Sequence, residues 1–99
     1  MRRVMTQGAR FRAGCLDIAW LANEAGHPRL GLVVAKFQSN AVARNRLRRR
    51  LKELWRRRGQ PLLGEIDVVI RTRPAAYRAT FGELSSALLG WVETAPKKV

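Results

Sequence analysis

The stretch that decides the fold is SNAVARNRLRRRLKELWRRRG, residues 39–59. Ser39 or Asn40 can cap a helix, because either side chain can accept a hydrogen bond from a free backbone N–H group of the first turn. The helix then runs to about Arg58, where Gly59 ends it. Apolar residues recur at steps of three and four, which predicts one buried stripe along the helix: Val42 or Ala43, Leu47, Leu51, Leu54 and Trp55.

Almost everything else on this helix is basic. Residues 44–58 contain nine Arg or Lys and a single acid, Glu53. Like charges four residues apart cost about 0.2–0.5 kcal/mol per pair, so the apolar stripe has to offset this repulsion by packing on the rest of the domain. At 100° per residue, the polar side chains separate into a first flank (Asn45, Arg48, Arg49 and Lys52) and a second flank (Arg46, Arg50 and Arg57). Arginine binds phosphate bidentately and stacks on bases, so two such flanks suit two backbones or two parts of one folded RNA.

The composition of the whole chain favours the same kind of partner. Its 99 residues carry 20 Lys and Arg against 7 Asp and Glu, a net charge of +13. A field of this strength favours an anionic partner, with nucleic acid first and an anionic membrane surface second. A membrane-surface helix would need an exposed apolar face, but here the core requires that stripe. The apolar run Leu30–Ala35 is too short to span a bilayer, so we expect no membrane partner.

The segments before the basic helix predict strands. Residues 1–7 form a basic stub of one or two helical turns. Phe11–Leu21 alternates like a strand, with an interruption near Gly14. Arg29–Lys36 is a short apolar run typical of a buried strand, and we expect it to form a hairpin with the preceding strand.

The segments after the basic helix predict a strand and a closing helix. Asp67–Arg73 is a strand that Pro74 ends, and Thr80 with Glu83 fits a capping box at the start of the last helix. That helix is expected to bury Phe81, Leu84, Leu88, Trp91 and Val92. Residues 1–99 therefore form one α+β domain, a small two-layer sandwich of a three- to four-stranded sheet with helices, whose residues 93–99 are a frayed tail.

The sequence offers no constellation of residues for catalysis or for metal binding. His27 is the only histidine and lies in a predicted turn, and Cys15 is the only cysteine. A zinc site or a Ser-His-Asp arrangement needs more ligands or partners than these. The acids are scattered, whereas a two-metal nuclease needs carboxylates that converge on one point. We expect no catalytic residue and no metal site, and a single cysteine fits a reducing cytoplasm.

Residues 40–52, NAVARNRLRRRLK, resemble the bacterial ribonuclease P protein component, which carries an Arg-Asn-Arg signature in such a run. The likeness extends to the flanking strands, RLGLVVAK at residues 29–36 and DVVIRTRP at residues 67–74, and to the closing helix over residues 81–88. Residues 4–21 align more loosely. The resemblance therefore covers most of the chain.

This resemblance implies a fold and a role that spacing alone does not show. The family fold is like the second domain of ribosomal protein S5. Its βαβ crossover is left-handed, whereas such crossovers are almost always right-handed. The protein binds ribonuclease P RNA, and the holoenzyme removes the 5′ leader from precursor tRNA by endonucleolytic cleavage. Catalysis belongs to the RNA and to Mg²⁺ bound mainly by it. In the family, the protein holds the 5′ leader in a cleft between the sheet and the first helix, and we expect the same of this chain. We expect the protein to act in the cytoplasm. No obligate protein partner is evident.

The family's RNA-binding positions fall on named residues of this chain. They are Lys36, Asn40, Arg44, Asn45, Arg46, Arg48, Arg49 and Lys52, and the second flank adds Arg50. For the leader cleft, Met5 lies where the family usually has an aromatic, with Phe11 on the strand beyond and Phe37 as a substitute stacking surface. The chain departs from the family at Ala19, where an aromatic is common.

Two other classes of protein remain as alternatives. Composition alone also fits a small ribosomal or other structural RNA-binding protein. A DNA-binding module is the other, but the strand-like segment before the basic helix does not fit a helix-turn-helix.

Overall fold

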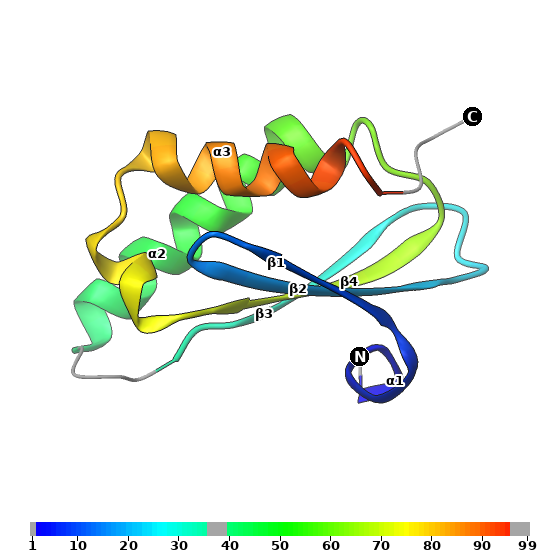
Figure 1. Ribbon diagram of the computed structural model, residues 1–99, viewed down its shortest axis with the longest axis horizontal. Coiled ribbons are helices and arrows are strands. Elements are labelled where there is room, and N and C mark those ends of the chain that lie inside the picture. Colours follow the sequence, from blue (N-terminus) through cyan, green and yellow to red (C-terminus); the bar gives the residue numbers. More distant parts are fainter. Residues whose placement is uncertain (1, 36–39, 96–99) are drawn as a thin grey trace.

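A computed structural model describes residues 2–35 and 40–95, and it shows two helices on one face of a four-stranded sheet and a short helix on the other (Figure 1). In chain order the elements are α1 (Arg2–Gln7), β1 (Ala9–Ala13), β2 (Leu16–Ala22), β3 (Arg29–Val33), α2 (Ala41–Leu54), the π-helical turn η1 (Trp55–Gly59), β4 (Ile66–Thr72), the 3-10 helix η2 (Pro74–Arg78) and α3 (Phe81–Val92). The α+β fold class is therefore confirmed.

The sheet has the order β1-β2-β4-β3, which corrects one expectation. The predicted hairpin between the second and third strands is wrong, because β4 lies between them, antiparallel to β2 and parallel to β3. Parallel neighbours need a crossover, and α2 supplies it between β3 and β4. The hairpin of the fold is instead β1–β2, whose two-residue turn contains Gly14 at φ +57°, at the predicted interruption. The handedness of the crossover stays a prediction.

The strand expected to be buried over residues 29–36 is an edge strand. β3 ends at Val33, and both Arg29 and Val33 are exposed. The strand pairs only with β4, so one of its edges has no strand partner among the described residues. In contrast, Val68, Val69 and Ile70 of β4 are all buried, because central β4 is covered on both faces.

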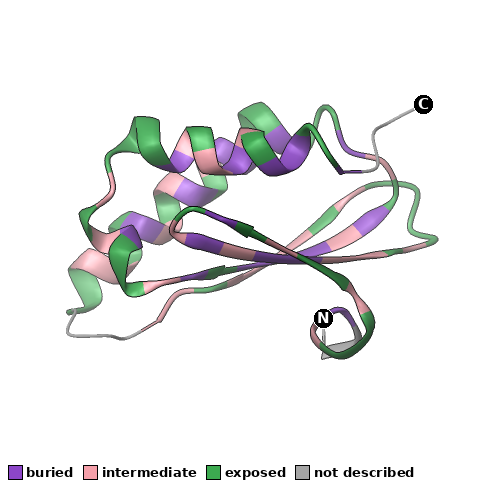
Figure 2. Cartoon of the chain, viewed as in Figure 1, coloured by how far each residue is buried: buried purple, intermediate pink, exposed green. Residues whose placement is uncertain are grey.

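The core lies between the sheet and the two long helices (Figure 2). The predicted stripe of α2 is buried at Leu47, Leu51, Leu54 and Trp55, but Val42 is 64% exposed, so Ala43 is the member of the stripe. The α-helix itself ends at Leu54, and η1 continues it to Gly59, close to the predicted end at about Arg58. The Gln60 N–H donates to the Trp55 carbonyl over 2.8 Å.

The closing helix confirms most of its prediction. The capping box of Thr80 and Glu83 is present, and Leu84, Leu88, Trp91 and Val92 are buried. Phe81 was expected in the core but is 42% exposed, because it is the first helical residue and the buried stripe begins only one turn later. Of the tail expected to fray over residues 93–99, only residues 93–95 are described. There Ala95 is buried and its N–H donates to the Trp91 carbonyl.

Candidate nucleic-acid interface

The N-terminus of α2 presents the Arg-Asn-Arg signature at the surface. Asn40 is the N-cap of α2, and the Asn40 side chain accepts a hydrogen bond from the Ala43 N–H over 2.8 Å. Asn45 and Arg46 of the signature are exposed, whereas Arg44 is half-buried. Of the other predicted RNA-binding residues, Arg49 and Lys52 are exposed and Arg48 and Arg50 are half-buried. Lys36 and Phe37 lie outside the described residues.

The basic side chains keep these positions because the opposite side of α2 is anchored. Leu47, Leu51 and Leu54 are 4%, 1% and 1% exposed. Full burial of such a side chain is worth roughly 1.5–3 kcal/mol, several times the repulsion of one like-charge pair on the helix. Packing therefore outweighs the charge repulsion and fixes the helix with its arginines outward.

Acidic partners are concentrated at the far end of this helix. Glu53 pairs with Arg56 at 2.8 Å and with Arg57 at 2.5 Å, and Arg56 beside it lowers the pKa of the Glu53 carboxyl. Within residues 2–35 and 40–95, no ion pair to an acid involves the following basic residues of α2: Arg46, Arg48, Arg49, Arg50 and Lys52. Their charges are available to an anionic ligand.

The second flank lies against η2. Arg46 and Arg50 line a small cavity of about 50 Å³ with Ala76 and Tyr77 of η2. This places Arg46 and Arg50 on one side of α2, as the helical spacing predicted. Arg57 of the same flank is held by Glu53.

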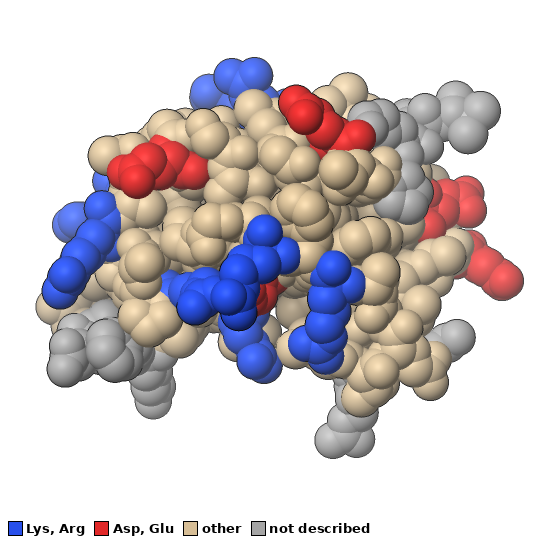
Figure 3. Space-filling view, viewed as in Figure 1, with Lys and Arg blue, Asp and Glu red and all other residues tan. Residues whose placement is uncertain are grey.

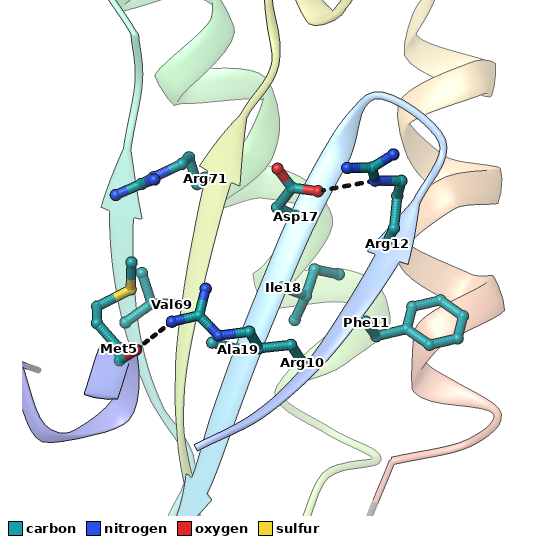
Figure 4. A pocket seen from close by; sticks show the side chains of 9 residues that line it. All are labelled: Met5, Arg10, Phe11, Arg12, Asp17, Ile18, Ala19, Val69 and Arg71. Atoms are coloured by element: carbon teal, nitrogen blue, oxygen red, sulfur yellow. Dashed lines mark hydrogen bonds and ion pairs between the residues drawn. The ribbon is translucent and has the colours of Figure 1, made fainter. Parts of the chain in front are cut away.

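A second basic surface lies on the sheet face that α1 partly covers. A cleft of about 290 Å³ opens there, and Figure 4 shows its lining residues: Met5 of α1, Arg10, Phe11 and Arg12 of β1, Asp17, Ile18 and Ala19 of β2, and Val69 and Arg71 of β4. Ala19 and Val69 are buried beside Val4 of α1, and they make the cleft floor small and apolar.

Hydrogen bonds and one ion pair order the rim of this cleft. A terminal guanidinium nitrogen of Arg10 donates to the Met5 carbonyl and so ties β1 to α1 (Figure 4). Arg12 pairs with Asp17 at 3.6 Å, and Arg71 is the cross-strand partner of Asp17 in the β2–β4 ladder. The cleft is therefore lined by three arginines and one carboxylate, and Arg12 and Arg71 flank that carboxylate.

The predicted cleft residues have different surroundings. Met5 lies in the cleft next to Arg10, whereas the ring of Phe11 points away from Met5 (Figure 4) and Phe11 packs against the main core. Sequence reasoning missed Arg10, Arg12 and Arg71. The two-residue spacing of Arg10 and Arg12 was a signal that both share one face of a strand, but the register that brings Arg71 to them was not available.

Charge is unevenly distributed over the face drawn in Figure 3. Basic side chains gather in the middle and at the left, the top carries both signs, and the right carries acidic side chains. A polyanion would therefore meet an attractive field over the left and the middle of this face.

Residues 2–35 and 40–95 hold neither a cluster of metal-binding side chains nor a helix that could span a membrane. No three His, Cys, Asp or Glu side chains lie together in a way that could hold a metal ion. None of the described helices is long and apolar enough to cross a membrane.

Comparison with known sequences gives consistent matches. The Ribonuclease P family model matches residues 1–95. The ribonuclease P protein component of Syntrophobacter fumaroxidans is 36% identical over 89 residues, which are 89% of this chain and 75% of that protein. That of Thermus scotoductus is 36% identical over 85 residues, 86% of this chain. The chain spans only about half the length of the Thermus protein, 49%.

Comparison with solved structures supports the same fold. The ribonuclease P protein of Thermotoga maritima superposes with a TM-score of 0.82 at 23% identity, over 91% of this chain and 88% of that one. That of Staphylococcus aureus gives a TM-score of 0.83 at 24% identity, over 94% and 85%.

Proposed function

The chain belongs to the ribonuclease P protein family, and from this membership we propose that it is the RNA-binding subunit of ribonuclease P. In this role it assists a catalytic RNA in the endonucleolytic removal of the 5′ leader from precursor tRNA in the cytoplasm. The observation that carries the proposal is α2, on which Arg46 and Arg49 are exposed and form no ion pair with a described acid, while Leu47, Leu51 and Leu54 are buried. The alternative of a structural ribosomal protein is not favoured, because the curated relatives reported above are ribonuclease P components.

We assign the contact with ribonuclease P RNA to α2. Its first flank and second flank present guanidinium groups in two directions, which suits a folded RNA better than a single flat surface. Residues Arg44, Asn45, Arg46, Arg48, Arg49, Arg50 and Lys52, with Asn40 at the N-cap and Lys36 before it, form the proposed contact. If about six phosphates are neutralised, the affinity falls with a log–log salt slope of roughly −4 to −5.

We assign cleavage to the RNA and to Mg²⁺ ions bound mainly by it. Carboxylates that hold catalytic metals must converge, and the acids described in this chain do not. The protein's contribution is then electrostatic, since a basic surface lowers the cost of bringing two RNAs together.

We assign the 5′ leader to the sheet cleft. Arg10, Arg12 and Arg71 can neutralise phosphates of a single strand, and the apolar floor at Ala19 and Val69 can receive a base. In this assignment the arginines supply the charge contacts of a single-strand site, and Met5 is the apolar wall on the α1 side.

The direct test is cleavage of precursor tRNA by ribonuclease P RNA at low Mg²⁺, with and without this protein. We expect the protein to lower the Mg²⁺ concentration that is required for cleavage at the mature 5′ end. Arg49→Ala should reduce this effect, whereas Arg56→Ala, at the arginine that Glu53 engages, is the matched control. A protein that leaves the Mg²⁺ requirement unchanged contradicts the proposal.

A further inference from the structure

The backbone of Ala35 is held by two side chains where the sheet no longer reaches it. β3 ends at Val33. The Ala35 N–H donates to Oγ1 of Thr72 over 3.1 Å, and the Tyr77 hydroxyl donates to the Ala35 carbonyl oxygen. We call these two hydrogen bonds the Ala35 clamp. It joins the chain that leaves β3 to the end of β4 and to η2.

The Thr72 side chain accepts its hydrogen bond from a buried position. It is 3% exposed, and among the described residues it is the one buried polar residue. A valine would fill nearly the same space without a polar atom, and a buried hydroxyl is unfavourable unless it is hydrogen-bonded. The hydroxyl is therefore explained by the Ala35 backbone that it binds.

The Tyr77 side chain connects the clamp to the second flank of α2. Besides binding Ala35, it lines the small cavity that also has Arg46 and Arg50 on its wall. The neighbouring Ala76 is 2% exposed and belongs to the main core, so η2 is held against the domain. Tyr77 thus contacts the chain before α2 and borders the side of α2 that carries two arginines.

We propose that Tyr77 is a positioning residue for RNA binding by Arg46 and Arg50, which rests on the proposed function. Its hydroxyl anchors the ring to Ala35, and the anchored ring limits the directions that the Arg46 and Arg50 side chains can take. Fewer conformations of these side chains are lost on binding, so affinity increases. Tyr77 carries no positive charge, so it contributes without adding to the number of counterions released.

The test is the affinity for ribonuclease P RNA as a function of salt. Tyr77→Phe should weaken binding by about 3- to 10-fold, the effect of one hydrogen bond of ordinary strength, and leave the log–log salt slope unchanged. Arg46→Ala should weaken binding and also reduce the slope by about one. The affinity of the double variant should fall by less than the product of the two single effects. Once Arg46 is removed, Tyr77 no longer has that side chain to position.

Control variants separate positioning from stability. Thr94→Val removes a hydroxyl that donates to the Trp91 carbonyl over 2.9 Å, at the end of α3, and should leave RNA affinity unchanged. Thr72→Val should weaken binding like Tyr77→Phe, and Thr72→Ser, which keeps the hydroxyl, should restore it. Thermal melting of each variant records the change in stability.

Three results would overturn the inference: wild-type affinity in Tyr77→Phe, an equal loss in Thr94→Val, or multiplicative effects with Arg46→Ala. Failure of the proposed function looks different. There the wild-type protein itself binds duplex DNA as tightly as ribonuclease P RNA and leaves precursor cleavage unchanged.

Discussion

Arg29 binds Asp67 through two hydrogen bonds, from Nε to Oδ1 over 2.7 Å and from a terminal nitrogen to Oδ2 over 2.8 Å. The two residues are also direct partners in the β3–β4 ladder, so the pair joins the first residue of the edge strand to the central strand. Asn23 donates to the same carboxylate over 2.8 Å. The connection between β2 and β3 is therefore held at its base by one acid.

This pair predicts how stability depends on pH. Arg29, with Asn23, holds the pKa of the Asp67 carboxyl below its ordinary value near 3.8. A lowered folded-state pKa contributes stability that is present above the unfolded pKa and is lost as pH falls through the folded one. We expect urea denaturation to show an advantage of wild type over Asp67→Asn that is constant at neutral pH and shrinks below about pH 4.

Two further variants check the assignment of this pH dependence. In Arg29→Gln, the acid-induced loss of stability should occur at higher pH. The hydrogen bond from Arg29 is the largest cause of the lowered Asp67 pKa, and this variant removes it. Glu24→Gln, an exposed acid of the same connection, is the control. An advantage over Asp67→Asn that persists undiminished at pH 2 contradicts the assignment.

The first flank of α2 predicts a change in salt dependence. Arg49→Ala should weaken binding to ribonuclease P RNA and reduce the log–log salt slope by about one, because one phosphate contact is lost. Arg56→Ala should change the slope less, since Arg56 is already paired with Glu53 at 2.8 Å. Filter binding at several salt concentrations measures both. Equal slopes in wild type and Arg49→Ala would show that Arg49 does not contact phosphate.

Removing the charge of Asp17 in the sheet cleft should increase the affinity for single-stranded RNA. Asp17 pairs with Arg12, and the exposed fractions of the two side chains are 43% and 71%. Asp17→Asn removes a charge that repels phosphate and frees Arg12, so single-stranded leader RNA should bind about 2- to 5-fold more tightly, the range of a surface ion pair. Asp17→Glu, which keeps the charge, is the control. Weaker binding by Asp17→Asn would mean that Arg12 needs Asp17 to hold its position.

The junction of α1 and β1 predicts a large loss of stability from one methyl group. A Cβ at Gly8 would lie 2.5 Å from the Val4 carbonyl oxygen and 2.6 Å from that of Trp20, and both are backbone atoms. Gly8→Ala should cost about 1–3 kcal/mol of unfolding free energy, as for other overpacked sites, and displace α1 from the cleft.

Gly90→Ala is the matched control for this glycine. Nothing lies within 4 Å of a Cβ at Gly90, inside α3, and alanine is the better helix former there by up to about 1 kcal/mol. We expect it to raise the urea midpoint. If Gly8→Ala is as stable as wild type, the close approach of α1 to β2 is looser than the structure shows.

The limits of prediction differ between the helices and the sheet. Caps and apolar spacing are local signals, so the helix over residues 40–58 and the capping box at Thr80 could be predicted from sequence. Strand partners depend on contacts between distant residues, and alternation fixes the face of a strand but not its neighbour. The continuous apolar run Val68-Val69-Ile70 was the available sign of a central strand. A strand with one exposed face would alternate apolar and polar residues, whereas a strand buried on both faces is apolar throughout.

The candidate site shows the same division. Arg46 and Arg49 lie on one helix, and their relation follows from 3.6 residues per turn. The sheet cleft needs Arg12 and Arg71 from strands that are far apart in the sequence, and only the β2–β4 register brings them to the same carboxylate.

The central place of β4 in the sheet governs the order of events when the chain is made. β2 and β3 do not pair with each other, so neither gains its inner neighbour until the ribosome has released residues 66–72. The arginine-rich α2 is synthesised before that strand, and the core that anchors it cannot close without β4. Synthesis at about 5–20 residues per second leaves α2 without its sheet for a few seconds on an RNA-rich machine. We therefore expect correct folding of the nascent chain to compete with premature binding of α2 to ribosomal RNA.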